Sequence, residues 1–335
     1  MLCRIINEKF SSRFSHFFDI IKNLINIGVI MSLLVVGSIA YDTVETPFGK
    51  VERAIGGSAM YSSVSASFFH PVNLVAVVGS DFPDSEIAFL ASRGIDTAGL
   101  EVCEGSTFAW EGKYGYDLNS AQTVNTHLNV FEKFNPSLPD NFKGSETVLL
   151  GNIDPILQMN IINQISNPRL TAIDTMNHWI TSKKDELLKV ISRVDIVIIN
   201  DAEARQLTDE YNIIKAAYSI LKHGPRYLII KRGEYGSLLF YESKIFSLPA
   251  FPLEVVKDPT GAGDSFAGGF MGYISRLEDI TPENLKQAVV VGTVMASINV
   301  EDFSLKRFKS IKSIDITERI KQFKKILHFE EIADI

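Results

Sequence analysis

Short apolar runs and amphipathic stretches alternate along this chain from Met31 onward, and the alternation restricts the folds that the chain can adopt. Apolar runs bounded by turn residues indicate buried strands, and apolar residues at helical spacing indicate helices. Strands that alternate with helices favour a mostly parallel sheet covered by helices. The predicted strands are Leu33–Ile39, Val72–Val78, Thr147–Leu150, Thr171–Asp174, Ile196–Asn200 and Tyr227–Lys231. The predicted helices are Ser58–Phe69, Ser85–Arg93, Ile156–Ile165, Lys183–Ser192, Ala202–Leu207, Ile213–Lys222, Gly263–Leu277, Pro282–Val300 and Ile316–Ile326.

Two segments, 43–55 and 100–131, interrupt the alternation, and the second contains no helical pattern. Aromatic residues at even spacings in the second segment would share one face of an extended strand. These residues are Phe108, Trp110, Tyr114 and Tyr116. Residues 123–131 are the expected partner strand. We expect the two segments to form a small sheet outside the main one that acts as a lid. Its aromatic face either packs against the protein or contacts a ligand.

The first 30 residues stand apart from this pattern. The apolar run Gly28–Ala40 has 13 residues, which is too short to cross a bilayer. With Lys22 before it, the run also resembles the apolar part of a signal peptide. However, residues 33–38 fit better as a first core strand that ends at a glycine turn. We therefore expect residues 1–30 to be a dispensable extension, or to result from a misassigned start whose true site is Met31. Residues 31–335 are expected to form the functional domain.

Composition defines the class of protein. The chain has 335 residues, of which 46% are hydrophobic and 22% are charged, as in globular proteins with a large core. This length fits one large α/β domain with an attached subdomain, or two ordinary domains. The net charge of -7 argues against a nucleic-acid partner. The two cysteines, Cys3 and Cys103, lack metal-ligand spacing and favour a reducing compartment. We therefore expect a cytoplasmic protein that does not associate with membranes.

Residues 258–264 read Asp-Pro-Thr-Gly-Ala-Gly-Asp and lead directly into a predicted helix. The amides of Gly261, Ala262 and Gly263 therefore lie at a helix amino end, where unpaired N–H groups and the helix dipole favour a phosphate. Asp264 would repel that phosphate. Its presence makes chemical sense if the carboxylate accepts a proton from a hydroxyl that attacks phosphorus. The alternative is a simple turn in which an aspartate caps the helix.

Polar residues also follow several predicted strands, and ligands of parallel α/β sheets bind at the carboxyl ends of strands. These candidates are Asp42, Asp174, Asn177, Asn200 and Glu203. Asp42 is placed to hold a polyol, and Asp174 and Asn177 to face phosphates or substrate. Each has a local alternative: Asp42 could start a turn, while Asn200 could cap a helix that carries Glu203 in its first turn.

The string Asp-x-x-Gly-Ala-Gly-Asp, followed by Ser-Phe-Ala-Gly-Gly, resembles the carboxy-terminal signature of the ribokinase-like PfkB family of carbohydrate kinases. Gly56, Gly57 and Ser58 resemble its amino-terminal signature, whose backbone lies against the substrate. Ribokinases proper have Lys directly after the glycine pair and Asn three residues later. This chain has Ser58 and Tyr61 there. Ser58 is closer to the adenosine-kinase branch and Tyr61 matches neither branch, so the resemblance does not assign ribose as the acceptor.

The same resemblance implies residues that bind the nucleotide and ions. Asn200-x-x-Glu203 is similar to the family motif that organises Mg²⁺ and phosphate, with Glu203 acting on the metal indirectly. Lys231, Gly233 and Gly236 match the nucleotide loop, in which the glycines let the backbone approach ATP. Thr260 and Asp258 match positions that hold a monovalent cation, K⁺, in some members. The chain has neither a P-loop nor a Rossmann fingerprint, and the family uses neither.

The implied fold is a ribokinase-like three-layer α/β/α arrangement with a mainly parallel central sheet and a small β-sheet lid. The implied activity is ATP-dependent phosphotransfer to a primary hydroxyl of a sugar, with Asp264 as general base. A nucleoside kinase of the same fold is the first alternative. A non-catalytic protein that senses nucleotides or sugars is an alternative of another class. We expect a small-molecule substrate and either a monomer or a homodimer formed through the lid.

Overall fold

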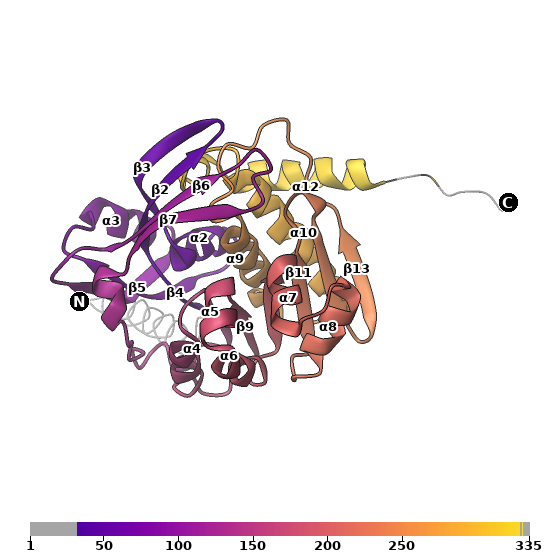
Figure 1. Cartoon of the computed structure of the whole chain (residues 1–335), viewed down its shortest axis with the longest axis horizontal. Coiled ribbons are helices and arrows are strands. Elements are labelled where there is room, and N and C mark those ends of the chain that lie inside the picture. The colour runs from indigo at the N-terminus through magenta and orange to yellow at the C-terminus, as the bar shows by residue number, and fades with distance from the viewer. Residues whose placement is uncertain (1–31, 329, 331–335) are drawn as a thin grey trace, which may run out of the picture. The chain divides into compact units, whose positions relative to one another are not determined.

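The structure, a computed structural model, describes residues 32–328 and residue 330. The expectations for residues 1–30 and for a start at Met31 lie outside the described residues. The described chain forms a large sheet, a small sheet and a series of helices (Figure 1). In this part of the chain, no helix is both long and apolar enough to cross a membrane.

The large sheet has nine strands in the order β13-β12-β11-β10-β9-β8-β1-β4-β5. Its strands are β1 (Leu33–Val36), β4 (Val72–Gly79), β5 (Ile95–Cys103), β8 (Thr147–Leu150), β9 (Leu170–Asp174), β10 (Ile196–Asn200), β11 (Tyr227–Lys231), β12 (Ser237–Tyr241) and β13 (Lys244–Leu248). Neighbours from β5 to β11 pair in parallel, while β12 and β13 add antiparallel strands at one edge. The predicted mostly parallel sheet is therefore confirmed.

Alternate residues of the inner strands enter two separate cores, one on each face of the large sheet, whereas the edge strands β5 and β13 contribute only to the first. In β1, Leu33 and Val35 join one core, and Leu34 and Val36 join the other. The first core is covered by α2 (Ser58–Ala66), α3 (Asp84–Ser92), α9 (Ala262–Ser275), α10 (Pro282–Asn299), α11 (Lys306–Ser310) and α12 (Ser313–Leu327). The second is covered by α4 (Pro155–Ile162), α5 (Asn177–Ser182), α6 (Lys184–Ile191), α7 (Asp201–Thr208) and α8 (Ile213–Leu221). The predicted three-layer α/β/α fold is confirmed.

A second sheet of four strands has the order β3-β2-β6-β7. Its strands are β2 (Ala40–Thr46), β3 (Gly49–Gly56), β6 (Phe108–Tyr114) and β7 (Ala121–His127), drawn in indigo to magenta in Figure 1. β2 pairs antiparallel with β3 and parallel with β6, and β6 pairs antiparallel with β7. The predicted small sheet therefore exists. The segment 100–131 contributes to it only in part, because residues 100–103 complete β5 and Asn129–Lys133 forms the 3-10 helix η1.

The first predicted strand is shorter than expected, because β1 ends at Val36 and β2 already starts at Ala40. Residues 37–39 carry the chain from the large sheet to the small one. Gly57 makes this crossing possible: its φ is 95°, and a Cβ there would lie 2.6 Å from the carbonyl oxygen of Ser38. Asp42 consequently lies inside β2, and neither ends a strand of the large sheet nor starts a turn.

The prediction that four aromatic residues share one face of a strand is wrong for the last of them, Tyr116. β6 stops at Tyr114, and Tyr116 lies beyond it, with 91% of its surface exposed. An irregularity in the pairing with β7 between Glu111 and Gly112 also changes the register within the row. At the other end, the ring of Phe108 stacks on Phe131 with 5.3 Å between the ring centroids, so this residue packs against the protein.

Candidate active site

The amino end of α9 is the predicted anion site. Gly261 is the N-cap of this helix, and its φ of 74° lies in the left-handed region. A side chain at this position would also collide with Tyr61, because a Cβ would lie 2.4 Å from its Cδ2 atom. Glycine therefore allows a tight turn directly beneath the helix end. Amides of a first helical turn lack acceptors within the helix, so together with the helix dipole they favour an anion here.

Asp264 supplies a carboxylate in this first turn. Its backbone is fixed by α2, because the hydroxyl of Ser62 donates a hydrogen bond of 3.1 Å to the Asp264 carbonyl. Removal from water raises the pKa of the Asp264 carboxyl to about 7; Asp174 adds to the rise and Lys231 opposes it. A carboxyl with a pKa close to neutrality is matched to accepting a proton from an alcohol at physiological pH.

Lys231, at the end of β11, brings a positive charge to the same place. Its Nζ lies 2.6 Å from Oδ2 of Asp174, at the end of β9, and both side chains are largely buried. The Nζ atom is also 2.9 Å from the position that a Cβ of Gly263 would occupy, so the ammonium group lies against the first turn of α9. Burial alone would lower the pKa of Lys231, but Asp174 and Glu203 raise it above its ordinary value.

Asn200 and Glu203 confirm the local alternative, because they cap α7, while their role in binding Mg²⁺ and phosphate stays a prediction. The Asn200 side chain accepts from the Glu203 amide at 2.8 Å, and the Glu203 carboxylate accepts from the Asn200 amide at 3.0 Å. This reciprocal pair caps α7. Glu203 is also buried, and burial raises its pKa to about 7, with Lys231 lowering it and Asp174 raising it. The capping pair therefore holds a carboxyl group within the electrostatic field of the Lys231 ion pair.

Asp42 and the glycine pair form the side of the site nearest the small sheet. Asp42 is buried, and its Oδ2 atom lies where a Cβ of Gly56 would be, 1.9 Å away. Burial, followed by the charges of Asp258 and Asp264, raises the pKa of Asp42 to about 8, and a hydrogen bond from the Gly57 amide opposes the rise. Only glycine at position 56 leaves room for this carboxyl group. Asp42 and Asp264 therefore belong to one electrostatic cluster although they lie in different sheets and helices.

Ser58 occupies a more interior position than the prediction implied. Its Oγ accepts from the Ser38 amide at 3.1 Å and lies 3.2 Å from the Ser38 hydroxyl. The Cβ positions of Gly37 and Gly151 would fall 2.6 and 2.9 Å from the same oxygen. Gly57, and not Ser58, is the N-cap of α2. The hydroxyl of Ser58 thus holds the crossing between the two sheets together.

Two tyrosines complete the cluster, and the sequence reasoning did not assign either to the site. Tyr61 is buried, and its ring lies against both Gly56 and Gly261. Burial, followed by the charges of Asp42 and Asp258, raises its pKa. Tyr114 comes from β6 of the small sheet, and its hydroxyl accepts a 3.3 Å hydrogen bond from Thr260 Oγ1. The departure of Tyr61 from the family's Asn was the available signal. Nothing in the local sequence reveals the contact between Tyr114 and Thr260.

Asp258 is buried and directly precedes residues 259–261, the turn that leads into α9 and is called the anion loop below. Its Oδ1 accepts from the Thr260 amide at 2.9 Å and its Oδ2 from the Ser304 amide at 3.3 Å. Burial raises its pKa, although these bonds oppose the rise. Asn299 lies beside it and donates from Nδ2 to the Thr260 carbonyl at 2.7 Å. The Oδ1 atom of Asn299 is buried and lacks a hydrogen-bond partner within the described residues. This oxygen is therefore an available acceptor next to Asp258.

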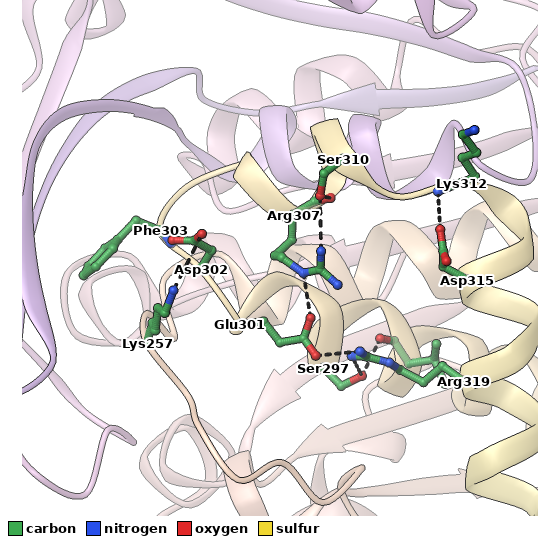
Figure 2. Close-up of polar contacts among 11 residues, drawn as sticks. Lys257, Ser297, Glu301, Asp302, Phe303, Arg307, Ser310, Lys312, Asp315 and Arg319 are labelled. Carbon is green, nitrogen blue, oxygen red and sulfur yellow. Dashed lines mark hydrogen bonds and ion pairs between the residues drawn. The ribbon is translucent and has the colours of Figure 1, made fainter.

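An ion-pair network fixes the loop that contacts Asp258. Figure 2 shows Glu301 between two arginines, with Nε of Arg307 at 2.7 Å and Nη2 of Arg319 at 2.5 Å. Arg319 comes from α12, while Glu301 directly follows the end of α10. The preceding carbonyl, that of Val300, accepts from the Asp258 amide at 3.3 Å. The last helix is thus connected through charged side chains to the anion loop.

The predicted nucleotide loop follows β11. Gly233 and Gly236 both have positive φ, 55° and 84°. The 3-10 helix η2 (Gly233–Tyr235) begins at the first of these glycines and ends directly before the second. The tip of the β6–β7 hairpin reaches this loop, because Oδ1 of Asn119 lies 2.3 Å from the position of a Gly233 Cβ. The small sheet therefore touches the anion loop through Tyr114 and the nucleotide loop through its tip.

Asn177 stands apart from the other predicted site residues. It begins α5 and is exposed to solvent, and within residues 32–328 no hydrogen bond links its side chain to the carboxylate cluster. A separate hollow of about 460 Å³ lies beside α8 and the β12–β13 turn and is lined by Tyr218, Arg226 and Lys244, among others. It lies at the amino end of β11, the end opposite to Lys231, and contains no predicted site residue.

A helix amino end with a carboxyl group in its first turn, beside the carboxyl ends of parallel strands, is the arrangement expected of α/β phosphotransferases. Residues 31–309 match the model of the pfkB family carbohydrate kinase. This range covers most of the chain and contains every predicted site residue. The chain therefore belongs to the pfkB carbohydrate kinase family.

Known relatives support the assignment. The chain is 30% identical over 267 residues to a cytidine kinase of Thermococcus kodakarensis, a match that covers 77% of this chain and 95% of that protein. It is 25% identical to a nucleoside kinase of Thermoplasma acidophilum, covering 84% of this chain and 90% of that protein. Among solved structures, a nucleoside kinase of Methanocaldococcus jannaschii matches with a TM-score of 0.70 and 21% identity over 87% of this chain and 99% of that one. The structural match shows a shared fold.

Proposed function

We propose that this protein transfers the γ-phosphoryl group of ATP to the primary hydroxyl of a nucleoside ribose. The observation that carries the proposal is Asp264, a carboxyl with a pKa of about 7 held in the first turn of a helix whose amides form an anion site. In the reaction, Asp264 accepts the hydroxyl proton while the oxygen attacks phosphorus. The amides of Gly261, Ala262 and Gly263 stabilise the charge on the phosphoryl oxygens.

The relatives favour a nucleoside as the acceptor. Four relatives with significant similarity are cytidine or nucleoside kinases, and one of these is matched over 95% of its length. In the proposed complex, Asp42 and the backbone of Gly56 and Gly57 hold the ribose, with Ser58 supporting them from below. Asn177 lies at the rim. The buried pair of Asp42 and Tyr61 suits recognition of a hydroxyl group, because each can donate or accept a hydrogen bond.

A free sugar is the second candidate acceptor. A deoxyribokinase of Salmonella typhi is 25% identical and is matched over 83% of its length. Asp42 would hold the hydroxyls of a free pentose as well as those of a nucleoside. A sensing protein without turnover is disfavoured, because Asp264, the anion site and the Asn200–Glu203 pair are all present together.

The nucleotide and its ions are part of the proposal. Asn200, Glu203, Lys231, Gly233, Gly236 and Thr260 would surround ATP. The family uses ATP as phosphate donor, typically with a divalent metal. Among the described side chains, no three acidic, His or Cys residues converge into a ready-made metal site. Mg²⁺ would therefore be held chiefly by phosphate oxygens, with Glu203 acting through water, and would supply positive charge to them. The unpartnered oxygen of Asn299 beside Asp258 fits a monovalent cation such as K⁺.

The small sheet acts in this proposal as the lid of domain 31–335, with segments 43–55 and 100–131 supplying it. Its contact through Tyr114 with Thr260 supports this role. All residues of β7 are exposed, which leaves an edge strand available either to solvent, in a monomer, or to a second copy, in a homodimer. A cytoplasmic location, drawn from cysteine content, completes the proposal.

A substrate panel tests the proposed activity. Purified protein is incubated with ATP, Mg²⁺ and either K⁺ or Na⁺, and ADP release is measured with cytidine, uridine, adenosine, inosine, ribose, deoxyribose and fructose. We expect the highest kcat/KM with a nucleoside. Higher kcat/KM with a free pentose would assign the sugar alternative. ATP binding without ADP release for any alcohol would contradict the kinase proposal and favour a sensor.

A further inference from the structure

The Lys231–Asp174 ion pair is largely buried, although Lys231 belongs to the predicted nucleotide loop. The lysine side chain is 17% exposed and the aspartate side chain 6% exposed. Burying two charges costs several kcal/mol of desolvation free energy, so a buried ion pair is weak evidence for a contribution to stability. A buried pair at a phosphate site is better explained by the chemistry of that site.

The aspartate in this pair is held rigidly. Its Oδ1 atom accepts from the Thr175 amide at 2.8 Å, and its Oδ2 accepts from Lys231 at 2.6 Å. Its backbone carbonyl also accepts from the amide nitrogen of the buried Gln158 side chain at 3.0 Å. Since both carboxylate oxygens and the carbonyl have donors, Asp174 has a single orientation. Lys231 is the member of the pair with a long flexible stem.

The charges around Lys231 make it the positive group that a bound phosphoryl group would need at this place. Lys231 interacts electrostatically with three carboxyl groups, those of Asp174, Glu203 and Asp264. A γ-phosphoryl group at the α9 amides would add further negative charge next to Asp264. The ammonium group already lies against the backbone of Gly263 in that first turn. A phosphoryl group bound there would therefore meet the amides on one side and the lysine on another.

We propose that Lys231 is a catalytic residue that contacts the transferred phosphoryl group, and that Asp174 is the residue that positions it. This inference rests on the proposed kinase function and deepens it. In the step, the acceptor oxygen forms a bond to the γ-phosphorus and its proton passes to Asp264. The bond from that phosphorus to the β–γ bridging oxygen breaks, and its electron pair leaves with ADP. Lys231 stabilises the charge on the non-bridging oxygens of the group in transit.

Three variants test the inference. Lys231→Met keeps the length of the side chain and removes its charge, and we expect kcat to fall roughly 10²–10³-fold, as for loss of one preorganised donor to a developing charge. Lys231→Arg retains the charge in a different geometry and should restore part of that loss. Asp174→Asn should lower kcat about tenfold and leave the KM of the acceptor within about threefold. Lys309→Met is the matched control, because it removes a surface ion pair of 2.7 Å to Glu86.

Two further measurements separate chemistry from structure. ADP with aluminium fluoride, Mg²⁺ and the acceptor imitates the phosphoryl group in transit. Lys231→Met should raise the Kd of this complex about 100-fold more than it raises the Kd of ADP alone. The acidic limb of the kcat/KM pH profile should move to higher pH in Lys231→Met and to lower pH in Asp174→Asn, since the two charges shift the pKa of Asp264 in opposite directions.

The outcomes distinguish this inference from the function on which it rests. If the wild-type protein phosphorylates no alcohol of the panel, the proposed function fails, and the role of Lys231 falls with it. If the wild type is active and Lys231→Met retains kcat within threefold, the lysine inference alone is wrong. Lys231→Met could instead lose thermal stability while the ratio of its Kd values for ADP and for ADP–aluminium fluoride equals that of the wild type. That result would assign the ion pair a purely structural role.

Discussion

Asp264 combines a position that weakens phosphate binding with a pKa that suits proton transfer. A carboxylate at a helix amino end beside an anion site repels the incoming phosphate. The same surroundings, burial and the nearby Asp174, raise its pKa to about 7. The position is therefore unfavourable for binding and favourable for catalysis, which is the balance expected of a general base.

The Asp264→Asn variant tests this balance. The change keeps the size of the side chain and removes its ability to accept a proton. We expect kcat to fall roughly 10²–10⁴-fold, as for loss of a general base, while ATP binds as tightly as before or more tightly. Steady-state kinetics and calorimetric titration with ATP measure the two effects. In the wild type, kcat/KM should rise with pH through about 7, because the base acts only when deprotonated. A near wild-type rate for the variant would show that another group accepts the proton. An unfolded variant would show that the Asp264 carboxyl is needed for folding, although Gly261 and not Asp264 is the N-cap of α9.

Sequence reasoning located the residues that follow strands and the anion motif, because each belongs to a short local pattern. The structure adds neighbours that are distant in sequence. Tyr61 packs under Gly261, and Tyr114 bonds Thr260. Such contacts depend on how α2 and β6 dock. No spacing along the chain encodes this docking, so these residues were not predicted as part of the site.

At the scale of elements, the parallel strands of the large sheet were predicted more fully than the small sheet. Strands β6 and β7 were expected within segment 100–131, whereas β2 and β3 were expected only as the segment 43–55. β4 is buried at all eight positions, and a continuous apolar run is the signal that such a strand leaves in the sequence. β7, with every residue exposed, carries no such signal. β5 was missed because it lies at the edge of the sheet, where only Ile95 and Gly99 of its residues are buried, so it has no continuous apolar run. The pairing of these strands is set by tertiary contacts.

The contact between α2 and α9 holds Asp264 beside the small sheet, and Gly268→Ala tests it. A Cβ at Gly268 would lie 2.2 Å from the carbonyl oxygen of Ser62, so the helices would have to separate. We expect the free energy of unfolding to fall by about 1–3 kcal/mol, as for overpacking in a core. We also expect kcat to fall, because Ser62 anchors Asp264. Urea unfolding and steady-state assays measure both effects.

Gly144→Ala is the matched control for this change. A Cβ at Gly144 would meet nothing within 4 Å. Its effect on the free energy of unfolding should stay within about 0.5 kcal/mol, as for substitutions on an open surface. Equal losses in the two variants would mean that the close approach of α2 and α9 does not explain the loss of stability in Gly268→Ala.

At the scale of the whole described chain, the last helix supports the site from a distance. Arg319 of α12 pairs with Glu301, and the loop that begins there contacts Asp258 through the amide of Ser304. Figure 2 shows this path from α12 to the loop. The Asp258 corner is therefore stabilised by residues beyond 309, the last residue that matches the family model.

Glu301→Gln should weaken this support. The change removes the charge that pairs with two arginines, and we expect the free energy of unfolding to fall by about 1–3 kcal/mol, as for hydrogen bonds to charged groups. Any activation by K⁺ should require a higher concentration of the ion. Glu318→Gln is the control, because its pair with Lys321 is exposed, and it should change stability by less than about 1 kcal/mol. Equal effects of the two variants would show that the Glu301 network contributes no more than a surface pair.

The parallel pairing of β2 with β6 has a consequence for the order in which the molecule assembles. Between these two strands the chain passes twice through the large sheet, as β4 and β5. We therefore expect β6 to meet β2 after β4 has docked beside β1 and β5 beside β4, because distant segments pay the entropy of loop closure before they gain contacts. In native-state amide exchange, the hydrogen bonds between β2 and β6 should open without those of β1, β4 and β8. The pairing between β2 and β6 should then form late during folding and open early, whereas the local pairs β2–β3 and β6–β7 do not depend on β4 and β5.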